Sequence, residues 1–201
     1  MLQQHPVARA LRSDPADQPD STAARWGLAG VETMIGYAWL LSALNKWLNP
    51  GFRPGLAHML QGQLKDNPNH WWVAFMRWLV LPHAPIWAAL IQIGELLVAL
   101  GYGAGVLLWL SGRFPQARWA RRLNWGVLLA LLGGALMTTN YYLMDGNTVP
   151  FLSPSTPYKE GLSIDGTLTL VAVVLLAVHL IAVRARPDGS ATGRRAPRLT
   201  P

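Results

Sequence analysis

The sequence predicts an all-α integral membrane protein: a four-helix bundle with both termini in the cytoplasm and an interfacial helical insertion between the first two spans. Hydrophobic residues make up 51% of the 201 residues and charged residues only 13%, a balance typical of membrane proteins. A helix needs about 20 apolar residues to cross a hydrocarbon core of about 30 Å. Four runs meet that requirement, approximately at residues 26–48, 86–110, 123–143 and 164–183.

The segments on either side of the spans are predicted to be disordered cytoplasmic tails. Residues 1–25 mix charges with prolines and lack the apolar core of a signal peptide. Residues 184–201 are basic and rich in Pro, Gly and Arg, with too few apolar residues to bury a core. The sequence therefore divides into a tail at 1–25, a membrane domain at 26–183 and a second tail at 184–201.

The distribution of Lys and Arg predicts the orientation in the membrane. Three precede the first span, four lie between the second and third spans, and five follow the fourth, whereas the two longer loops hold three and one. Because positively charged loops stay inside, we expect both termini to be cytoplasmic. The expected location is a prokaryotic inner or plasma membrane, which the chain would cross several times. The net charge of +7 then reflects topology and attraction to anionic lipids, and no nucleic-acid partner is expected.

The first outer loop carries two segments with helical character, GLAHMLQGQLK and, after the turn DNPN, HWWVAFMRWLVL. Large apolar residues are expected on one face of the second segment: Trp71, Trp72, Phe75, Trp78 and Leu79. Arg77 falls off that face, which is the pattern of a helix lying in the membrane surface. The segment is predicted either to anchor the loop in membrane lipid, or to form a lid or a docking surface for a soluble partner.

Small residues and tryptophans in the spans indicate how the helices pack. Gly101 and Gly105 form GxxxG in the second span, and small residues repeat at the same spacing in the third, at 126, 130 and 134. Such spacing lets backbones approach closely, so these two helices are expected to pack together. Tryptophans near the span ends are expected at the membrane interface: Trp26, Trp47, Trp109 and Trp125.

The residue types exclude or disfavour several kinds of chemistry. The chain has no cysteine, so disulfide exchange, which needs a reactive thiol pair, is excluded. The five histidines show no HxxH or HxxxH spacing, and the sequence has no metal or haem motif. Only His179 lies within a span, and it is expected to be a hydrogen-bonded or interfacial group rather than a ligand.

Glu95 lies in the middle of the apolar run IQIGELLVALG, about 14 Å from the outer end of the second span at 1.5 Å per residue. A carboxylate at this depth costs a few kcal/mol unless it faces a partner or a water-filled cavity. Lys46, at the outer end of the first span, is the best partner by charge and side. Asn140 and Tyr141 end the third span, and Asp165 opens the fourth. The sequence therefore predicts an outward-facing pocket shared by all four helices.

This pocket has two interpretations. In the first, the polar residues form a structural network that holds the helices in register, without any substrate. In the second, they bind a polar or redox-active small molecule from the outer face, and Glu95 holds or relays a proton. Among the polar span residues considered, Glu32 is the one expected toward the inner surface.

Four motifs in the spans resemble a known family. The first span ends in LSALNKWLNPGF, the second carries IGELLVALGYGAG, the third ends in LMTTNYYL, and the fourth opens with EGLSIDGTLTL. Over residues 27–183 they resemble the DoxX/DoxD family of small four-helix membrane proteins. The resemblance implies the membrane subunit of a thiosulfate:quinone oxidoreductase, as in the DoxD branch, or of an oxidoreductase assembly linked to thiol and oxidative stress, as in DoxX-type members.

The resemblance also implies which residues act and what they bind. Lys46 would hold the anionic donor, and Glu95 would take or relay the proton that accompanies quinone reduction. Asn140 and Asp165, with Tyr141 beside them, would orient the head group. Quinone is the expected redox substrate, and a soluble or membrane redox subunit is the expected protein partner. The competing hypothesis is a non-enzymatic membrane scaffold or small-molecule-binding protein that docks a soluble redox enzyme.

Overall fold

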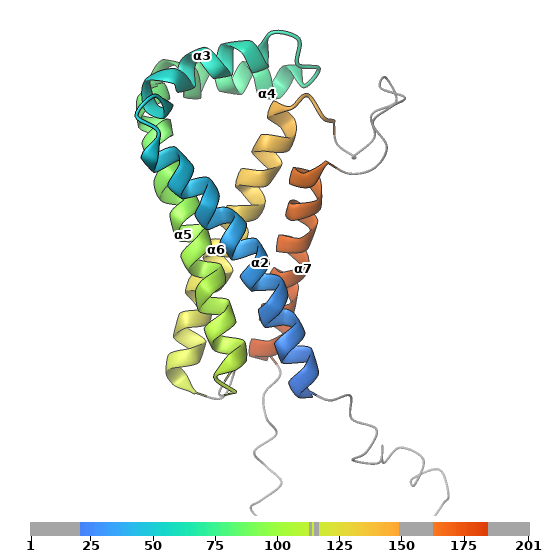
Figure 1. Ribbon diagram of the computed structural model, residues 1–201. Helices are drawn as coiled ribbons and strands as arrows, with labels where there is room; N and C mark the ends of the chain where they lie inside the picture. Colours follow the sequence, from blue (N-terminus) through green and yellow to red (C-terminus); the bar gives the residue numbers. More distant parts are fainter. Residues whose placement is uncertain (1–20, 113, 115–116, 149–162, 185–201) are drawn as a thin grey trace, which may run out of the picture.

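The computed structural model describes residues 21–112, 114, 117–148 and 163–184, and every element in these ranges is helical. The four long helices are α2 (Ser21–Leu48), α5 (Ala84–Leu110), α6 (Arg118–Met144) and α7 (Ile164–Arg184). Two shorter helices, α3 (Phe52–Leu64) and α4 (His70–Phe75), lie across one end of the long ones (Figure 1). We call α3 and α4 the roof.

Four segments are long and apolar enough to cross a membrane: Thr22–Leu48, His70–Leu110, Arg118–Met144 and Ile164–Arg184. Within the bundle, α2 packs on α5, α5 on α6, and α6 on α7. The predicted all-α fold with four helices long and apolar enough to cross a membrane is thereby confirmed. The cytoplasmic location of the termini and the interfacial location of the roof stay predictions.

The helices begin earlier than the apolar runs predicted. α2 begins at Ser21 rather than at residue 26, so residues 21–25 belong to a helix and not to a disordered tail. α6 begins at Arg118 rather than at residue 123. Backbone hydrogen bonding continues into polar sequence, whereas hydropathy marks only where the apolar side chains begin. The remainder of both predicted tails lies outside the described residues.

A tight turn leads from α2 into the roof. The Asn49 carbonyl accepts a hydrogen bond from the backbone N–H of Phe52 at 3.1 Å. The Asn49 side chain accepts another from the N–H of Gly51 at 2.9 Å. Asn, Pro and Gly are the residues that favour such turns, and here they reverse the chain between two helices.

A bend leads from the roof into the second span. α4 continues as a π-helical segment, η2 (Met76–Val80), and a 3₁₀ segment, η3 (Leu81–His83), before α5 begins. Pro82 lies in the 3₁₀ segment and Pro85 in the first turn of α5. Because proline has no N–H to donate, an unbroken α-helix cannot pass through these positions unchanged. The chain changes direction here from across the bundle to along it (Figure 1).

Asparagine side chains fasten the far turn of the roof to α6. Asn67 Nδ2 donates to the carbonyl of Leu143 at 2.7 Å, and Asn69 Nδ2 donates to the carbonyl of Asn147 at 2.7 Å. The Leu143 carbonyl lies in the last turn of α6, where it accepts from Asn67 as well as from the backbone N–H of Gly146 at 3.1 Å. The DNPN segment, which the sequence predicted only as a turn, therefore joins the roof to the third span.

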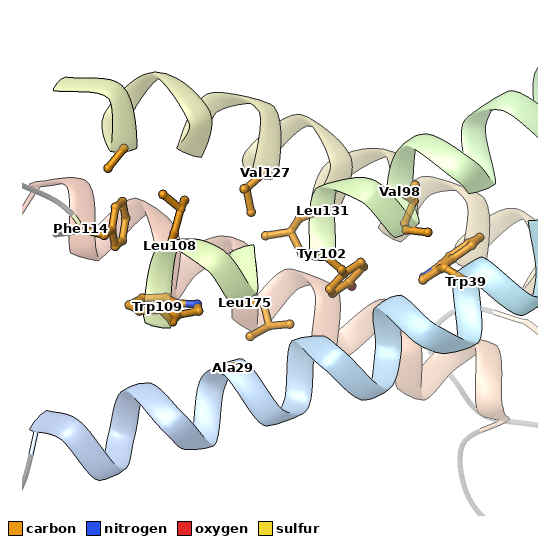
Figure 2. Close-up of a cluster of buried hydrophobic side chains, with 12 residues drawn as sticks. Ala29, Trp39, Val98, Tyr102, Leu108, Trp109, Phe114, Val127, Leu131 and Leu175 are labelled. Atoms are coloured by element: carbon orange, nitrogen blue, oxygen red, sulfur yellow. The ribbon is translucent and has the colours of Figure 1, made fainter. Parts of the chain in front are cut away.

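Apolar side chains form two clusters. The cluster inside the four long helices includes Trp39, Val98, Tyr102, Leu108, Leu131 and Leu175 (Figure 2). The cluster beneath the roof includes Leu56, Leu60, Trp72, Met76 and Tyr142. The roof thus has an apolar core of its own, which it shares with the end of α6.

The apolar face predicted for the second roof segment is wrong in part. Trp71, Phe75 and Trp78 are exposed, whereas Trp72 is 2% exposed and packs in the roof cluster. Leu79 packs against the same cluster. Successive residues on a helix point about 100° apart, so adjacent tryptophans can face opposite environments. The exposed face that remains is formed by residues 71, 75 and 78.

α5 approaches α6 closely at Gly101, because a Cβ added there would collide with the Ala130 side chain. The predicted close packing of the second and third spans is confirmed at this contact. Gly126, by contrast, has open space around it. Gly101→Ala is expected to lower the free energy of unfolding by about 1–3 kcal/mol, because the two helices must separate. Denaturant unfolding in detergent measures the change.

Gly103→Ala is the matched control, because a Cβ there meets no atom within 4 Å. Alanine is the better helix former, so this change is expected to raise stability by up to about 1 kcal/mol. A stabilisation by both substitutions would contradict the tight contact at Gly101.

Candidate functional site

A cavity of about 500 Å³ lies beneath the roof, a size usual for small-molecule sites. Its apolar wall consists of Phe52, Leu56, Met59, Leu60, Phe75, Met76, Val80, Trp87, Ile91, Leu136, Met137 and Met144. Its polar residues are Ser42, Lys46, Asn140, Tyr141, Asp145 and Asp165. The roof and all four long helices contribute, so the cavity is largely apolar with a polar part where α2, α6 and α7 meet it.

Glu95 and Lys46 form an ion pair beside this cavity. Lys46 Nζ lies 2.7 Å from Glu95 Oε1, and the Glu95 side chain is 0% exposed while that of Lys46 is 23% exposed. The predicted pairing of these two residues is therefore present in the structure. A buried charge is tolerated when it is paired and hydrogen-bonded, and here the pair joins α2 to α5.

Two hydroxyl groups complete the surroundings of Glu95. Tyr141 OH donates to Glu95 Oε1 at 2.7 Å, and Ser42 Oγ donates to Oε2 at 3.2 Å. Lys46 Nζ also donates to Ser42 Oγ at 2.8 Å. Ser42, Lys46 and Tyr141 line the cavity, whereas Glu95 is absent from the described lining residues. A bound molecule would therefore contact Glu95 through these three side chains.

Asn140 and Asp165 line the cavity but are not bonded to the ion pair. Asn140 Oδ1 accepts from Trp72 Nε1 at 2.9 Å, which ties α6 to the roof. Among the described residues, no hydrogen bond links the Asp165 side chain to Lys46 or Glu95. Of the residues predicted to form one network, Glu95, Lys46 and Tyr141 are joined directly, and the other two face the same cavity.

Gln92, which the sequence analysis missed, fixes the end of α2 that carries Lys46. Its side chain donates to the Lys46 carbonyl at 2.7 Å and accepts from Arg53 Nε at 2.7 Å. Its backbone carbonyl accepts from Trp47 Nε1 at 3.3 Å. Gln92 lies three residues before Glu95 on α5, so the two side chains share one face of the helix. From that face Glu95 binds the ammonium of Lys46, and Gln92 binds its backbone carbonyl.

The formal charges around the cavity disfavour an anion. The Glu95 carboxylate balances the Lys46 ammonium, and Asp145 and Asp165 add two further carboxylates to the wall. An ammonium has three N–H donors. Glu95 and Ser42 accept two of them among the described residues, which leaves one to serve a molecule in the cavity. The site therefore suits a ligand whose polar group is uncharged and accepts hydrogen bonds.

A second buried polar cluster lies toward the opposite end of the bundle. His179 Nε2 lies 2.8 Å from Glu32 Oε1, and His179 Nδ1 lies 2.6 Å from Asn124 Oδ1. Trp109 Nε1 donates to the same Glu32 oxygen at 3.0 Å. Each residue comes from a different long helix, and all four are buried. We call this group the Glu32–His179 cluster.

Glycine makes room for the carboxylate of this cluster. A Cβ at Gly105 would collide with Glu32 Oε2, an oxygen that is buried and has no hydrogen-bond partner among the described residues. The predicted role of His179 as a hydrogen-bonded group is confirmed. Trp109, which was predicted at the membrane interface, is buried in the bundle and donates its indole N–H to Glu32. Glu32 was predicted to be the one polar span residue toward the inner surface, but His179 and Asn124 lie in the same cluster.

No family model, no curated protein and no solved structure matches this chain. Within the described residues, no group of three His, Cys, Asp or Glu side chains is placed to hold a metal ion. The cavity, the ion pair beside it and the resemblance of the span motifs are therefore the features that indicate a function.

Proposed function

We propose that the chain is the membrane subunit of a quinone-linked oxidoreductase in a prokaryotic inner or plasma membrane, and that quinone binds in the cavity beneath the roof. The observation that carries the proposal is the character of this cavity: an apolar wall with a single ammonium donor, Lys46, among its described lining residues. A quinone ring has apolar faces and two carbonyl oxygens that accept hydrogen bonds. Its shape and polarity match such a site.

The ion pair gives the site a means of moving protons. Reduction of quinone to quinol takes two electrons and two protons. In the proposed mechanism Lys46 Nζ donates a hydrogen bond to a quinone carbonyl and passes a proton to that oxygen as it is reduced. Glu95, 2.7 Å from that nitrogen and ionised while Lys46 is charged, then takes up a proton from water and passes it to the Lys46 amine, which restores the ammonium. The second proton of the quinol comes from water at the other quinone oxygen. Tyr141 holds the carboxylate in position through its hydrogen bond to Oε1.

Thiosulfate or a related reduced sulfur compound is the proposed donor, on the resemblance to the DoxD branch alone. Two thiosulfate ions release two electrons and form tetrathionate, while quinone takes up those electrons with two protons. Because Asp145 and Asp165 oppose an anion in the cavity, we assign Lys46 to the quinone and not to the donor. The anion would be oxidised on a partner redox subunit, which then passes electrons to the quinone.

The test is quinone binding to the isolated chain in nanodiscs, followed by thiosulfate-dependent quinone reduction with and without co-purified partners. Lys46→Gln is expected to weaken binding about tenfold or more, because a hydrogen bond from a charged group is lost. Lys65→Gln is the matched control, since Lys65 is exposed and lies in the roof turn, outside the cavity wall. Folded protein that binds no quinone, or equal weakening by both changes, would rule out the proposed site.

A membrane scaffold is the second candidate, and one observation favours it. Both carboxylate oxygens of Glu95 accept hydrogen bonds from side chains of the protein. This arrangement is expected of a purely structural network, and it is equally expected of a ligand site before the ligand binds. A scaffold would dock a soluble redox enzyme and need no ligand of its own. Co-purification distinguishes the two: bound quinone in the isolated chain supports the redox subunit, whereas a stoichiometric soluble partner carrying its own cofactor supports the scaffold.

A further inference from the structure

The cavity reaches the surface of the protein through an apolar rim on α6. Leu136 lines the cavity, yet its side chain is 63% exposed, so it borders both the interior space and the surroundings. Phe75 on α4 also lines the cavity and is exposed at the surface. The rim is thus formed by side chains that favour contact with hydrocarbon.

The Leu136 side of this rim lies at the depth of the membrane interior. Leu136 stands eight residues before Met144, the last residue of α6. At 1.5 Å per residue it is about 12 Å below that end of the span. An opening at that depth faces acyl chains rather than water.

An exposed apolar strip runs along α6 up to the rim. Its members recur at intervals of four, three and four residues, which places them on one face of the helix. They are Trp125, Leu129, Leu132 and Leu136. In a spanning helix this strip contacts lipid, so it provides an apolar path between the bilayer and the cavity.

Another part of the cavity wall is polar. Lys46 and Asp165 line it there, and Asp145 lines it from an exposed position just beyond α6. The cavity therefore has both an apolar rim at Leu136 and a polar wall. A molecule that matches both has an uncharged polar head and an apolar tail.

We infer that the cavity takes its ligand sideways from the bilayer, past Leu136, and that this ligand is a tailed amphiphile with an uncharged head that accepts a hydrogen bond from Lys46. The head lies against the polar wall, and the tail leaves over Leu136 along the α6 strip. A membrane quinone with an isoprenoid tail has this chemistry, so in naming a quinone the inference rests on the proposed function. Phospholipids fit less well, because Asp145 and Asp165 oppose a phosphate.

The absence of cysteine from the chain permits a reversible test of the rim. Leu136→Cys creates a single thiol, which benzyl methanethiosulfonate caps after folding and dithiothreitol uncaps. Leu129→Cys is the matched control, because Leu129 is exposed on the same strip but does not line the cavity. Both variants are placed in nanodiscs, and the reductant is removed before the probe is added.

The probe is an azidobenzoquinone with a geranyl tail, compared with the same head bearing a methyl group. Apparent affinity is measured by photolabelling and mass spectrometry. Capping Leu136→Cys is expected to weaken binding of the geranyl probe about tenfold or more, because the bulky benzyl group fills the space that the tail must occupy, and uncapping restores binding. Capped Leu129→Cys should match the uncapped protein, and the methyl probe should bind more weakly than the geranyl probe throughout.

The outcomes separate this inference from the proposed function. Binding of the geranyl probe that capping leaves unchanged, or a methyl probe that binds as tightly as the geranyl probe, would overturn access from the bilayer even if quinone is reduced. Binding that is lost on capping and regained on uncapping supports lateral access even if no donor drives turnover. Because the same protein sample is tested capped and uncapped, a folding defect cannot imitate the result.

Discussion

Replacing His179 by leucine is expected to lower the free energy of unfolding by about 3–5 kcal/mol, because it leaves the Glu32 carboxylate buried without its ionisable partner. Glu32 is 0% exposed, and Trp109 Nε1 would be the sole remaining donor to it among the described residues. Asn124 also loses its partner on the ring. Denaturant unfolding in detergent, followed by circular dichroism, measures the loss.

Two comparisons show whether the loss comes from the broken pair. His58→Leu, at an exposed position in α3, is expected to change stability by less than about 0.5 kcal/mol. The double change of Glu32 and His179 to leucine should be less destabilising than the sum of the single changes, because no charge is left unpaired. Additive losses in this cycle would show that the two side chains are not coupled.

Replacing Glu95 by glutamine is expected to reduce quinone turnover about 100-fold or more, the usual loss when a proton-transfer group is removed. An amide can accept the hydrogen bonds of Tyr141 and Lys46, but it cannot take up or return a proton. The fold should survive, because glutamine has nearly the same shape and keeps a hydrogen-bonding oxygen beside the ammonium. Steady-state quinone reduction by the assembled enzyme, with unfolding midpoints on the same samples, tests this.

Asp66→Asn supplies the matched carboxylate-to-amide change. Asp66 is exposed in the roof turn and does not line the cavity, so turnover should be unaffected. If Glu95→Gln reduced quinone at the rate of the unaltered chain, Glu95 would have no part in proton transfer and would be left as a structural partner of Lys46.

The ion pair could be predicted from sequence because depth and charge together restrict the choices. A carboxylate near the middle of a span needs a partner, and Lys46 is the cation at the matching end of the neighbouring span. The position of Tyr141 near this pair could be predicted in the same way, by counting residues from the end of the third span. Asn140 and Asp165 were placed at the right end of the bundle, but depth alone does not say which way each side chain points around its helix.

The Glu32–His179 cluster was missed although its members lie at similar depths. The two residues are separated by 147 positions in the chain, and nothing in the local pattern of either helix indicates the contact. Comparing the depth of every polar span residue, rather than only those near Glu95, would have suggested the pair. The side-chain amides of Asn67 and Gln92 donate hydrogen bonds to backbone carbonyls, and these contacts cannot be recognised in the sequence. The carbonyls at any helix end can accept such hydrogen bonds, so no particular partner residue is indicated.

The Glu32–His179 cluster has a consequence for the order in which the membrane domain becomes complete. Of the four spans, the one that carries Glu32 leaves the ribosome first, and the one that carries its ionisable partner His179 leaves it last. Lys46 and Glu95, in contrast, lie in the first two spans and can meet as soon as both are inserted. In the C-terminal half of α2, Lys46 can therefore pair with Glu95 early in biogenesis. In the N-terminal half, Glu32 has no ionisable partner until the fourth span is inserted and His179 reaches it.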